Sequence, residues 1–340
     1  MESLKSLTIV FTEREQVAVR EEPVGPIGPD EVLCRARKSL ISTGTETLCL
    51  RGVFDADTLW ADWVRYPFLP GYSMAAEIVK TGENVTGWKP GDRVYVGESH
   101  RQYFVTAASN LKLIPAEISD EEAAWFSLAN TTQLGVRRAG LELGESVGVI
   151  GLGLLGQLVV QYLRLSGCRH VVAIDPAEAR LKLARQFGAT HGLAMDAGSA
   201  REGVNQITEG RMLDVVFDIT GHPAVLALAT RLAGRLGRVV LLGDSTVPSQ
   251  QVLGPKVVAN SISVLGTHAN LVRGFQGWDG SRMESLFFDY LVSGRMDVKS
   301  LITHRYSPAD AVRVYEGLLR DRSSALGVIL DWDLLEQAGV

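Results

Sequence analysis

The segment of residues 145–175 constrains the fold more than any other part of the chain. Its apolar run at 147–150 predicts a short strand, residues 155–165 predict a buried helix, and residues 170–174 predict a second strand that ends at Asp175. A glycine-rich turn joins the first strand to the helix. The order of strand, glycine turn, helix, strand and acid is typical of a unit that binds a dinucleotide. Four glycines and two glutamines within 147–165 argue against a membrane span.

The turn itself reads GLGLLG at residues 151–156. In this fingerprint the first glycine makes a tight turn, the second lets the backbone approach the pyrophosphate, and the third allows close packing of helix and strand. The N-terminus of the helix then receives the phosphate charge. We therefore predict that Gly151, Gly153, Leu154, Leu155 and Gly156 bind the cofactor. The alternative is an ordinary glycine-rich turn between a strand and a helix.

Asp175, at the end of the second strand, bears on the choice of cofactor. A carboxylate at this position accepts hydrogen bonds from the adenosine ribose and repels a 2′-phosphate, which favours NAD(H). Arg180 follows in the next predicted helix and is also within reach of the ribose. NADP(H) therefore stays open as the less favoured cofactor.

The composition is that of an ordinary globular protein. The chain has 340 residues, enough for roughly two domains. A net charge of −5 argues against nucleic acid or an anionic membrane as a partner and leaves a small molecule as the expected ligand. Cys34, Cys49 and Cys168 are too few and too widely spaced for a disulfide framework or a cysteine zinc cluster. Because the N-terminal residues lack the pattern of a signal peptide, we expect a cytoplasmic protein.

The periodicity of the chain changes along its length. Short strand-like runs separated by turn residues predict a β-rich first part, at residues 7–11, 17–20, 31–39, 75–79, 92–96 and 101–105. Residues 121–140 are mostly helical in pattern. Beyond them, strands alternate with helices, which predicts a doubly wound parallel sheet with further strands at 214–219, 238–242 and 261–265. After Gly266 helical and strand-like stretches follow each other without this regular alternation.

Four short motifs resemble the medium-chain dehydrogenase/reductase superfamily, the relatives of the zinc alcohol dehydrogenases. They are WKPGDRV at 88–94, LELGESV at 141–147, GRLGRVV at 234–240 and ITHR at 302–305. The resemblance implies an α/β protein with two domains: a GroES-like β-rich catalytic domain at 1–128 and 268–340, and a Rossmann domain with a doubly wound parallel sheet at 129–267. It further implies that Thr131, Gly243, Asp244 and His268 contact the cofactor. Alternatively, Thr131 bonds to its own helical turn and His268 has only a structural role.

The chain departs from this superfamily at the zinc ligands. Zinc-binding members read Cys-Gly-Thr-Asp and Gly-His-Glu where this chain has TGTE at 43–46 and GYS at 71–73, and Ser127 stands at the third ligand position. Zinc prefers thiolate, imidazole or carboxylate ligands. We therefore predict a zinc-independent protein without a bound metal. Glu46 and His100 alone are too few donors for a different metal site.

Without zinc, another group must stabilise the charge on the substrate during hydride transfer. A preorganised hydrogen-bond donor is the usual substitute. Tyr72 and Thr43 occupy former ligand positions, so we predict that their hydroxyls act as oxyanion donors or acids. Thr45 matches the hydroxyl that relays protons in the alcohol dehydrogenases, and we predict that it orients the reacting groups or relays a proton. The alternatives are that Tyr72 is a pocket wall and that the threonines only cap a turn or pack.

Aromatic residues flank the loops that border the substrate cleft in this superfamily. Together with Glu46 and His268, the candidate substrate contacts are Trp60, Trp63 and Trp278. If they face a pocket, the substrate is sizeable and partly apolar or planar; otherwise they close a core. The loop ISTGTE at 41–46 also resembles that of the bacteriochlorophyllide hydroxyethyl dehydrogenases, a zinc-lacking branch that oxidises a secondary alcohol on a large planar ring. Six matching residues are too few to assign the substrate of that branch to this chain.

Three functions remain open. The first is a zinc-independent NAD(H) dehydrogenase or ketoreductase for a secondary alcohol or ketone, serving biosynthesis; the loop at 43–46 favours it. The second is a reductase of a conjugated C=C or C=N bond, whose acceptor needs no Lewis acid. The third is a nucleotide-binding protein without activity. The superfamily also implies a homodimer paired through residues 261–265, which would cover an exposed sheet edge.

Overall fold

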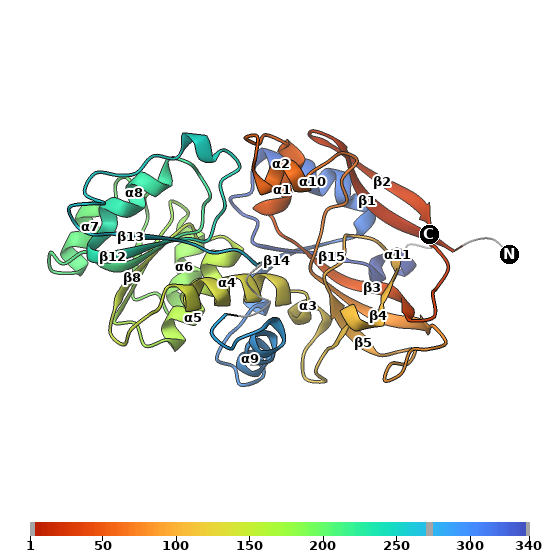
Figure 1. The fold of residues 1–340 in the computed structure, drawn as a ribbon. Helices are drawn as coiled ribbons and strands as arrows, with labels where there is room; N and C mark the ends of the chain where they lie inside the picture. Colours follow the sequence, from red (N-terminus) through yellow and green to blue (C-terminus); the bar gives the residue numbers. More distant parts are fainter. Residues whose placement is uncertain (1–3, 270–274, 338–340) are drawn as a thin grey trace. The chain divides into compact units, whose positions relative to one another are not determined.

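The computed structural model describes residues 4–269 and 275–337, which form two compact units (Figure 1). Unit 1 comprises Met1–Val53, Leu59–Ser127 and Val298–Val340, and unit 2 comprises Phe54–Thr58 and Leu128–Asp297. Unit 1 is β-rich and unit 2 holds a parallel sheet, so the predicted combination of a GroES-like part and a Rossmann part is confirmed.

The chain returns to unit 1 at Val298 rather than at the predicted residue 268. The reason is α9 (Gly280–Val292), which packs on α4 (Phe126–Arg138) through polar contacts. Asn130 Nδ2 donates to Glu284 Oε1 at 2.8 Å, and Gln133 Nε2 donates to the Met283 carbonyl at 3.0 Å. Residues 280–292 therefore group with unit 2.

The sheet of unit 1 combines strands from both ends of the chain. Its order is β14-β15-β3-β4-β5-β7, and β6 also pairs with β3. The strands are β3 (Glu31–Ile41), β4 (Met74–Thr81), β5 (Arg93–Val96), β6 (Tyr103–Ala107), β7 (Lys112–Leu113), β14 (Ile302–Tyr306) and β15 (Gly327–Asp331). A separate pair is formed by β1 (Lys5–Glu13) and β2 (Gln16–Pro23). Residues 38–41 of β3 pair with β15 and residues 31–35 pair with β6, so the C-terminal strand completes the sheet beside the loop that follows β3.

The helices of unit 1 are short. They are α1 (Thr45–Arg51), α2 (Leu59–Trp63), α3 (Asp120–Ala123), α10 (Ala311–Arg320) and α11 (Asp333–Gln337). The stretch 121–140 is mostly helical, as predicted, and it contains two separate helices, α3 and α4. The capping box of Ser119 and Glu122 starts α3, and Ala124 at ψ −4° ends it. The fully buried Trp125 then lies between the two helices.

Unit 2 contains the predicted doubly wound sheet. All six strands are parallel, in the order β10-β9-β8-β11-β12-β13. They are β8 (Ser146–Ile150), β9 (His170–Ile174), β10 (His191–Leu193), β11 (Leu213–Asp218), β12 (Ala233–Leu241) and β13 (Ser263–Gly266). Figure 1 shows α7 (Arg201–Ile207) and α8 (Val225–Leu232) on one face and α5 (Leu154–Leu165) on the other, and α5 also contacts α6 (Glu178–Phe187). Both faces are therefore covered, which explains the nearly continuous apolar runs of its strands.

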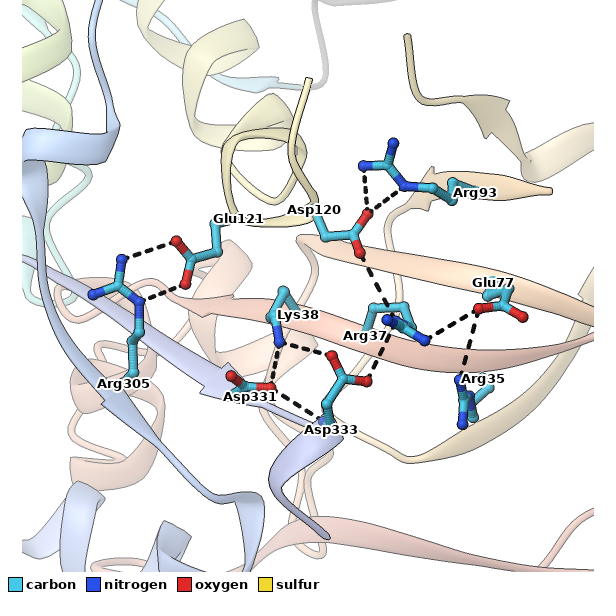
Figure 2. Close-up of polar contacts among 10 residues, drawn as sticks. All are labelled: Arg35, Arg37, Lys38, Glu77, Arg93, Asp120, Glu121, Arg305, Asp331 and Asp333. Atoms are coloured by element: carbon cyan, nitrogen blue, oxygen red, sulfur yellow. Dashed lines mark hydrogen bonds and ion pairs between the residues drawn. The ribbon is translucent and has the colours of Figure 1, made fainter. Parts of the chain in front are cut away.

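A network of charged side chains ties the C-terminal segment to β3 (Figure 2). Lys38 bonds to Asp331 and, at 2.8 Å, to Asp333, while Arg37 lies 3.3 Å from Asp333. Arg305 in β14 pairs with Glu121 at 2.5 and 2.9 Å. These contacts fix the last strands of the chain on the part of unit 1 that carries the predicted catalytic residues.

Candidate functional site

The carboxyl edge of the parallel sheet carries the predicted cofactor residues. The chain runs outward from β8 to β9 and β10, then starts again on the other side of β8 with β11. In open α/β sheets ligands bind outside the carboxyl ends of the strands at such a switch point. The turn after β8, Asp175 after β9 and Gly243 after β12 all lie at this edge.

The three glycines of the fingerprint each have a different local environment. Gly151 has φ +90°, a conformation that side chains with a Cβ rarely adopt. A Cβ on Gly156 would lie 2.0 Å from the Gly151 carbonyl oxygen, whereas a Cβ on Gly153 would have no heavy atom within 4 Å. The first glycine thus makes the turn, the third permits close packing, and the second borders open space at the N-terminus of α5. This cradle fits a dinucleotide pyrophosphate.

Asp175 is buried and already bonded to the glycine turn. Its Oδ2 accepts from the Leu152 N–H at 2.8 Å, and its Oδ1 accepts from the Ala177 N–H at 2.8 Å. Arg180 Nη1 lies 3.7 Å from Asp175 Oδ2. The carboxylate therefore stands beside the turn, as ribose recognition requires, with a cation next to it.

The loops after β11 and β12 pack closely against each other. A Cβ on Gly243 would lie 2.4 Å from the Ile219 carbonyl oxygen, and the Gly243 N–H donates to the Asp218 carbonyl. Burial raises the pKa of Asp218 above its usual value. Close packing thus explains the need for a glycine at position 243. Contacts of Gly243 and the adjacent Asp244 with the cofactor stay predictions.

In unit 1, two of the three predicted catalytic hydroxyls, those of Tyr72 and Thr45, meet next to α1. The Tyr72 hydroxyl donates to Thr45 Oγ1 at 3.4 Å and also bonds to the Ser42 side chain. Burial, with a smaller contribution from the charge of Glu46, raises the pKa of Tyr72 to about 12. Tyr72 therefore keeps its proton at neutral pH and can act as a hydrogen-bond donor.

Thr43 is buried in the same loop, but its described contacts are made by its backbone. The Thr43 carbonyl accepts from Thr47 Oγ1 at 2.7 Å and from Arg322 Nη1 at 3.2 Å. These contacts hold the loop onto α1 and the C-terminal part of unit 1. A chemical role for the Thr43 hydroxyl stays a prediction.

Glu46, a predicted substrate contact, is instead engaged within the protein. Its side chain is only 1% exposed. Oε1 accepts from the Ser42 N–H at 2.7 Å, while Oε2 lies 3.1 Å from His100 Nε2 and accepts from the Tyr315 hydroxyl at 2.5 Å. This burial, together with the bonds to both oxygens, gives no support to a substrate contact of Glu46.

His100 extends this cluster to the C-terminal segment. His100 Nδ1 lies 2.9 Å from Ser39 Oγ, which accepts from the Trp332 indole N–H at 2.9 Å. A proton on His100 Nε2 satisfies every group: Ser39 donates to Nδ1, and Nε2 donates to Glu46. Glu46 then accepts from three donors. We name Glu46, His100, Tyr315, Ser39 and Trp332 the buried network. The buried network could not be predicted from the sequence, because its members are far apart along the chain. Glu46 and Tyr315 are separated by 269 positions.

The residues at the former zinc positions do not fit zinc. Thr43, Tyr72 and Ser127 present hydroxyls, and in residues 4–269 and 275–337 no three His, Cys, Asp or Glu side chains come together as a metal site. Cys34 and Cys49 are fully buried, and burial raises the pKa of both thiols, that of Cys34 to about 12. Neither thiol is therefore disposed to ionise as a ligand.

The remaining predicted contacts are scattered. Trp60 is buried and packs near Trp63, with ring centroids 6.1 Å apart. Trp278 lies between two guanidinium groups, those of Arg137 and Arg282, at 3.3 and 3.8 Å. The last two predicted contacts are Thr131, which lies on α4, and His268, which is exposed after β13. Substrate or cofactor roles for all five residues stay predictions.

Comparisons with known proteins agree with this architecture. A family model described as a zinc-binding dehydrogenase matches residues 155–279, and one described as the alcohol dehydrogenase GroES-like domain matches residues 28–115. The L-threonine 3-dehydrogenase of Photorhabdus laumondii is 27% identical, over 97% of this chain and 100% of its own.

Solved structures resemble the fold. The 2R,3R-butanediol dehydrogenase of Bacillus subtilis has a TM-score of 0.78 at 20% identity, covering 96% of this chain and 99% of its own. The galactitol-1-phosphate dehydrogenase of Escherichia coli has a TM-score of 0.78 at 22% identity, covering 96% and 100%. At these identities the likeness concerns the fold alone. The two family matches and the relative of 27% identity support the medium-chain dehydrogenase/reductase superfamily of oxidoreductases for this chain.

Proposed function

We propose that this protein is a zinc-independent, NAD(H)-dependent oxidoreductase that interconverts a secondary alcohol and a ketone on a sizeable, partly apolar substrate, in a biosynthetic role. The observation that carries the proposal is the hydrogen bond between the hydroxyls of Tyr72 and Thr45. The resemblance implies a metal ligand at the position of Tyr72 and a relay hydroxyl at that of Thr45 in zinc-binding relatives. A protonated phenol is suited to the charge that develops on a carbonyl oxygen.

The cofactor would be held by the cradle of unit 2. Gly151, Gly153 and Gly156 would receive the pyrophosphate at the N-terminus of α5, and Asp175 would bind the adenosine ribose. When bound, the nicotinamide supplies or accepts the hydride. Asp175 supports NAD(H), whereas the nearby Arg180 supports some use of NADP(H).

In the direction of reduction, Tyr72 would donate its hydrogen bond to the substrate carbonyl oxygen. As hydride adds to the carbonyl carbon, the electron pair of the C=O bond moves to oxygen, which takes the proton of Tyr72. Ser42 and Thr45 would hold the phenol in place, and a proton from bulk water would pass through their hydroxyls to the oxygen of Tyr72. In the other direction, the alcohol proton would follow the same path to bulk water.

The first experiment measures NADH oxidation with matched bulky ketones and their α,β-unsaturated or imine counterparts. Turnover of the ketones supports the proposal. Turnover confined to the conjugated substrates would assign the protein to the reductases of C=C or C=N bonds. Tight NADH binding without turnover of either class would leave a non-catalytic nucleotide-binding protein.

We also propose a cytoplasmic homodimer that pairs through β13. In the described part of the chain β13 pairs with β12 alone, and Val264 on it is 37% exposed. An unpaired edge of this kind is commonly covered in soluble proteins. Light scattering tests the dimer, and a monomeric mass would contradict it.

A further inference from the structure

The buried network lies directly behind the loop that carries the predicted catalytic hydroxyls. Glu46 is the residue after Thr45, and its Oε1 accepts from the N–H of Ser42. Both Ser42 and Thr45 bond to Tyr72. One buried carboxylate thus joins the two residues that hold the phenol.

The far side of Glu46 is held by separate parts of unit 1. His100 comes from the segment between β5 and β6, and Tyr315 comes from α10. His100 is in turn fixed by Ser39 in β3, which also binds Trp332 after β15. The C-terminal part of the chain, returned to unit 1 after Asp297, therefore supports the 42–46 loop.

A charge at this depth is costly unless its partners compensate for lost water. Glu46 has three donors, and removing any of them or the carboxylate leaves a buried polar group unsatisfied. An apolar residue would pack here without that requirement. The arrangement is therefore better explained by a need to fix the loop geometry than by a general gain in stability.

We propose that Glu46, held by His100 and Tyr315, is a positioning residue that fixes the 42–45 loop so that Ser42 and Thr45 hold the Tyr72 hydroxyl. This inference rests on the function proposed above for Tyr72. Because Glu46 is buried and bonded within unit 1, it would act through the loop and not by direct contact with the substrate or the cofactor. Its negative charge also contributes to the raised pKa of Tyr72, after burial as the main cause.

The most direct test is Tyr315→Phe, which removes one donor to Glu46 and keeps the ring that packs on Phe11. Tyr162→Phe is the matched control, because Tyr162 is also buried and its hydroxyl bonds to Gln133 in unit 2. We expect kcat for Tyr315→Phe to fall roughly 10- to 100-fold, as misplacement of a catalytic group does. KM and NADH affinity should stay unchanged, and Tyr162→Phe should match the wild type.

A second readout does not depend on turnover. Carbon-13 labelling of tyrosine Cζ gives one NMR signal for each phenol, and Tyr72→Phe identifies that of Tyr72. We expect the Tyr72 signal to move in Tyr315→Phe and in Glu46→Gln and to stay in place in Tyr162→Phe. If Glu46→Gln does not fold, Tyr315→Phe alone decides.

The two readouts separate this inference from the proposed function. An unmoved Tyr72 signal together with an unchanged kcat in Tyr315→Phe would overturn the positioning role, even if Tyr72→Phe is inactive. If the Tyr72 signal shifts in Tyr315→Phe while Tyr72→Phe keeps full activity, the positioning role of Glu46 is supported and the catalytic role of Tyr72 is rejected.

Discussion

The Tyr72 hydroxyl donates to Thr45 Oγ1 at 3.4 Å, from the segment before β4 to the start of α1. The family resemblance implies a metal ligand at the position of Tyr72 in zinc-binding relatives. A phenol whose pKa is raised to about 12 retains its proton across the physiological range. The pair can therefore donate a hydrogen bond but cannot serve as a strong base near neutral pH.

Tyr72→Phe should lower kcat for the ketone substrate by about 10²-fold, the lower range for the loss of an acid–base group. KM and the affinity for NADH should change little, because the ring remains. Steady-state kinetics and NADH titration measure the three quantities. Tyr103→Phe in β6 provides the control within the same unit. Wild-type kcat in Tyr72→Phe would remove Tyr72 from the mechanism.

The glycine turn offers a matched pair of substitutions. Gly153→Ala should fold normally, because its Cβ enters open space, but it should weaken NADH binding about tenfold or more by obstructing a phosphate contact worth roughly 1.5 kcal/mol. Gly156→Ala should instead destabilise unit 2 by about 1–3 kcal/mol, because its Cβ meets the Gly151 carbonyl. Thermal unfolding and NADH titration distinguish the two effects. Equal losses of stability in both variants would contradict the assignment.

Asp175→Ala tests the choice of cofactor. Loss of a carboxylate bond to ribose should raise the KM for NADH about tenfold or more, and loss of its charge should improve the use of NADPH. Arg180→Ala, the neighbouring control, should weaken NADPH more than NADH. Kinetics with both cofactors give the ratio. A preference for NADPH in the wild type would show that Arg180 outweighs Asp175.

The pair of Glu121 and Arg305 predicts a pH-dependent contribution to stability. The hydrogen bond from Arg305 is the main cause that lowers the pKa of Glu121 below 4.5 in the folded protein. Because the folded-state pKa is the lower one, the stabilisation is present above about pH 4.5 and is lost as the pH falls through the folded value. The pair is partly exposed, so its contribution should be below about 1 kcal/mol.

Thermal unfolding of the wild type and Glu121→Gln at pH 7 and in acid measures this contribution. The wild type should unfold at the higher temperature at pH 7, and the difference should shrink in acid or in concentrated salt. A difference that grows on acidification would contradict the sign of the pKa shift.

The parts of the molecule set by local pattern were predictable. The turn at 151–156 and the strands around it follow from glycine spacing and apolar runs within one stretch of chain. The separation of α3 from α4 was missed, because it depends on how Trp125 is buried. The buried network was also missed: each of its bonds joins distant segments, and Glu46 alone carries no sign that Tyr315 and His100 will meet it.

Zinc independence is tested most directly by ketone reduction with enzyme that has been exhaustively dialysed against a chelator. The metal content is determined on the same sample. Hydroxyl donors at the positions of Thr43, Tyr72 and Ser127 predict that kcat stays unchanged without zinc and that added zinc has no effect. Activity that disappears on chelation and returns with zinc would contradict the central claim, and would require a metal site built from other residues.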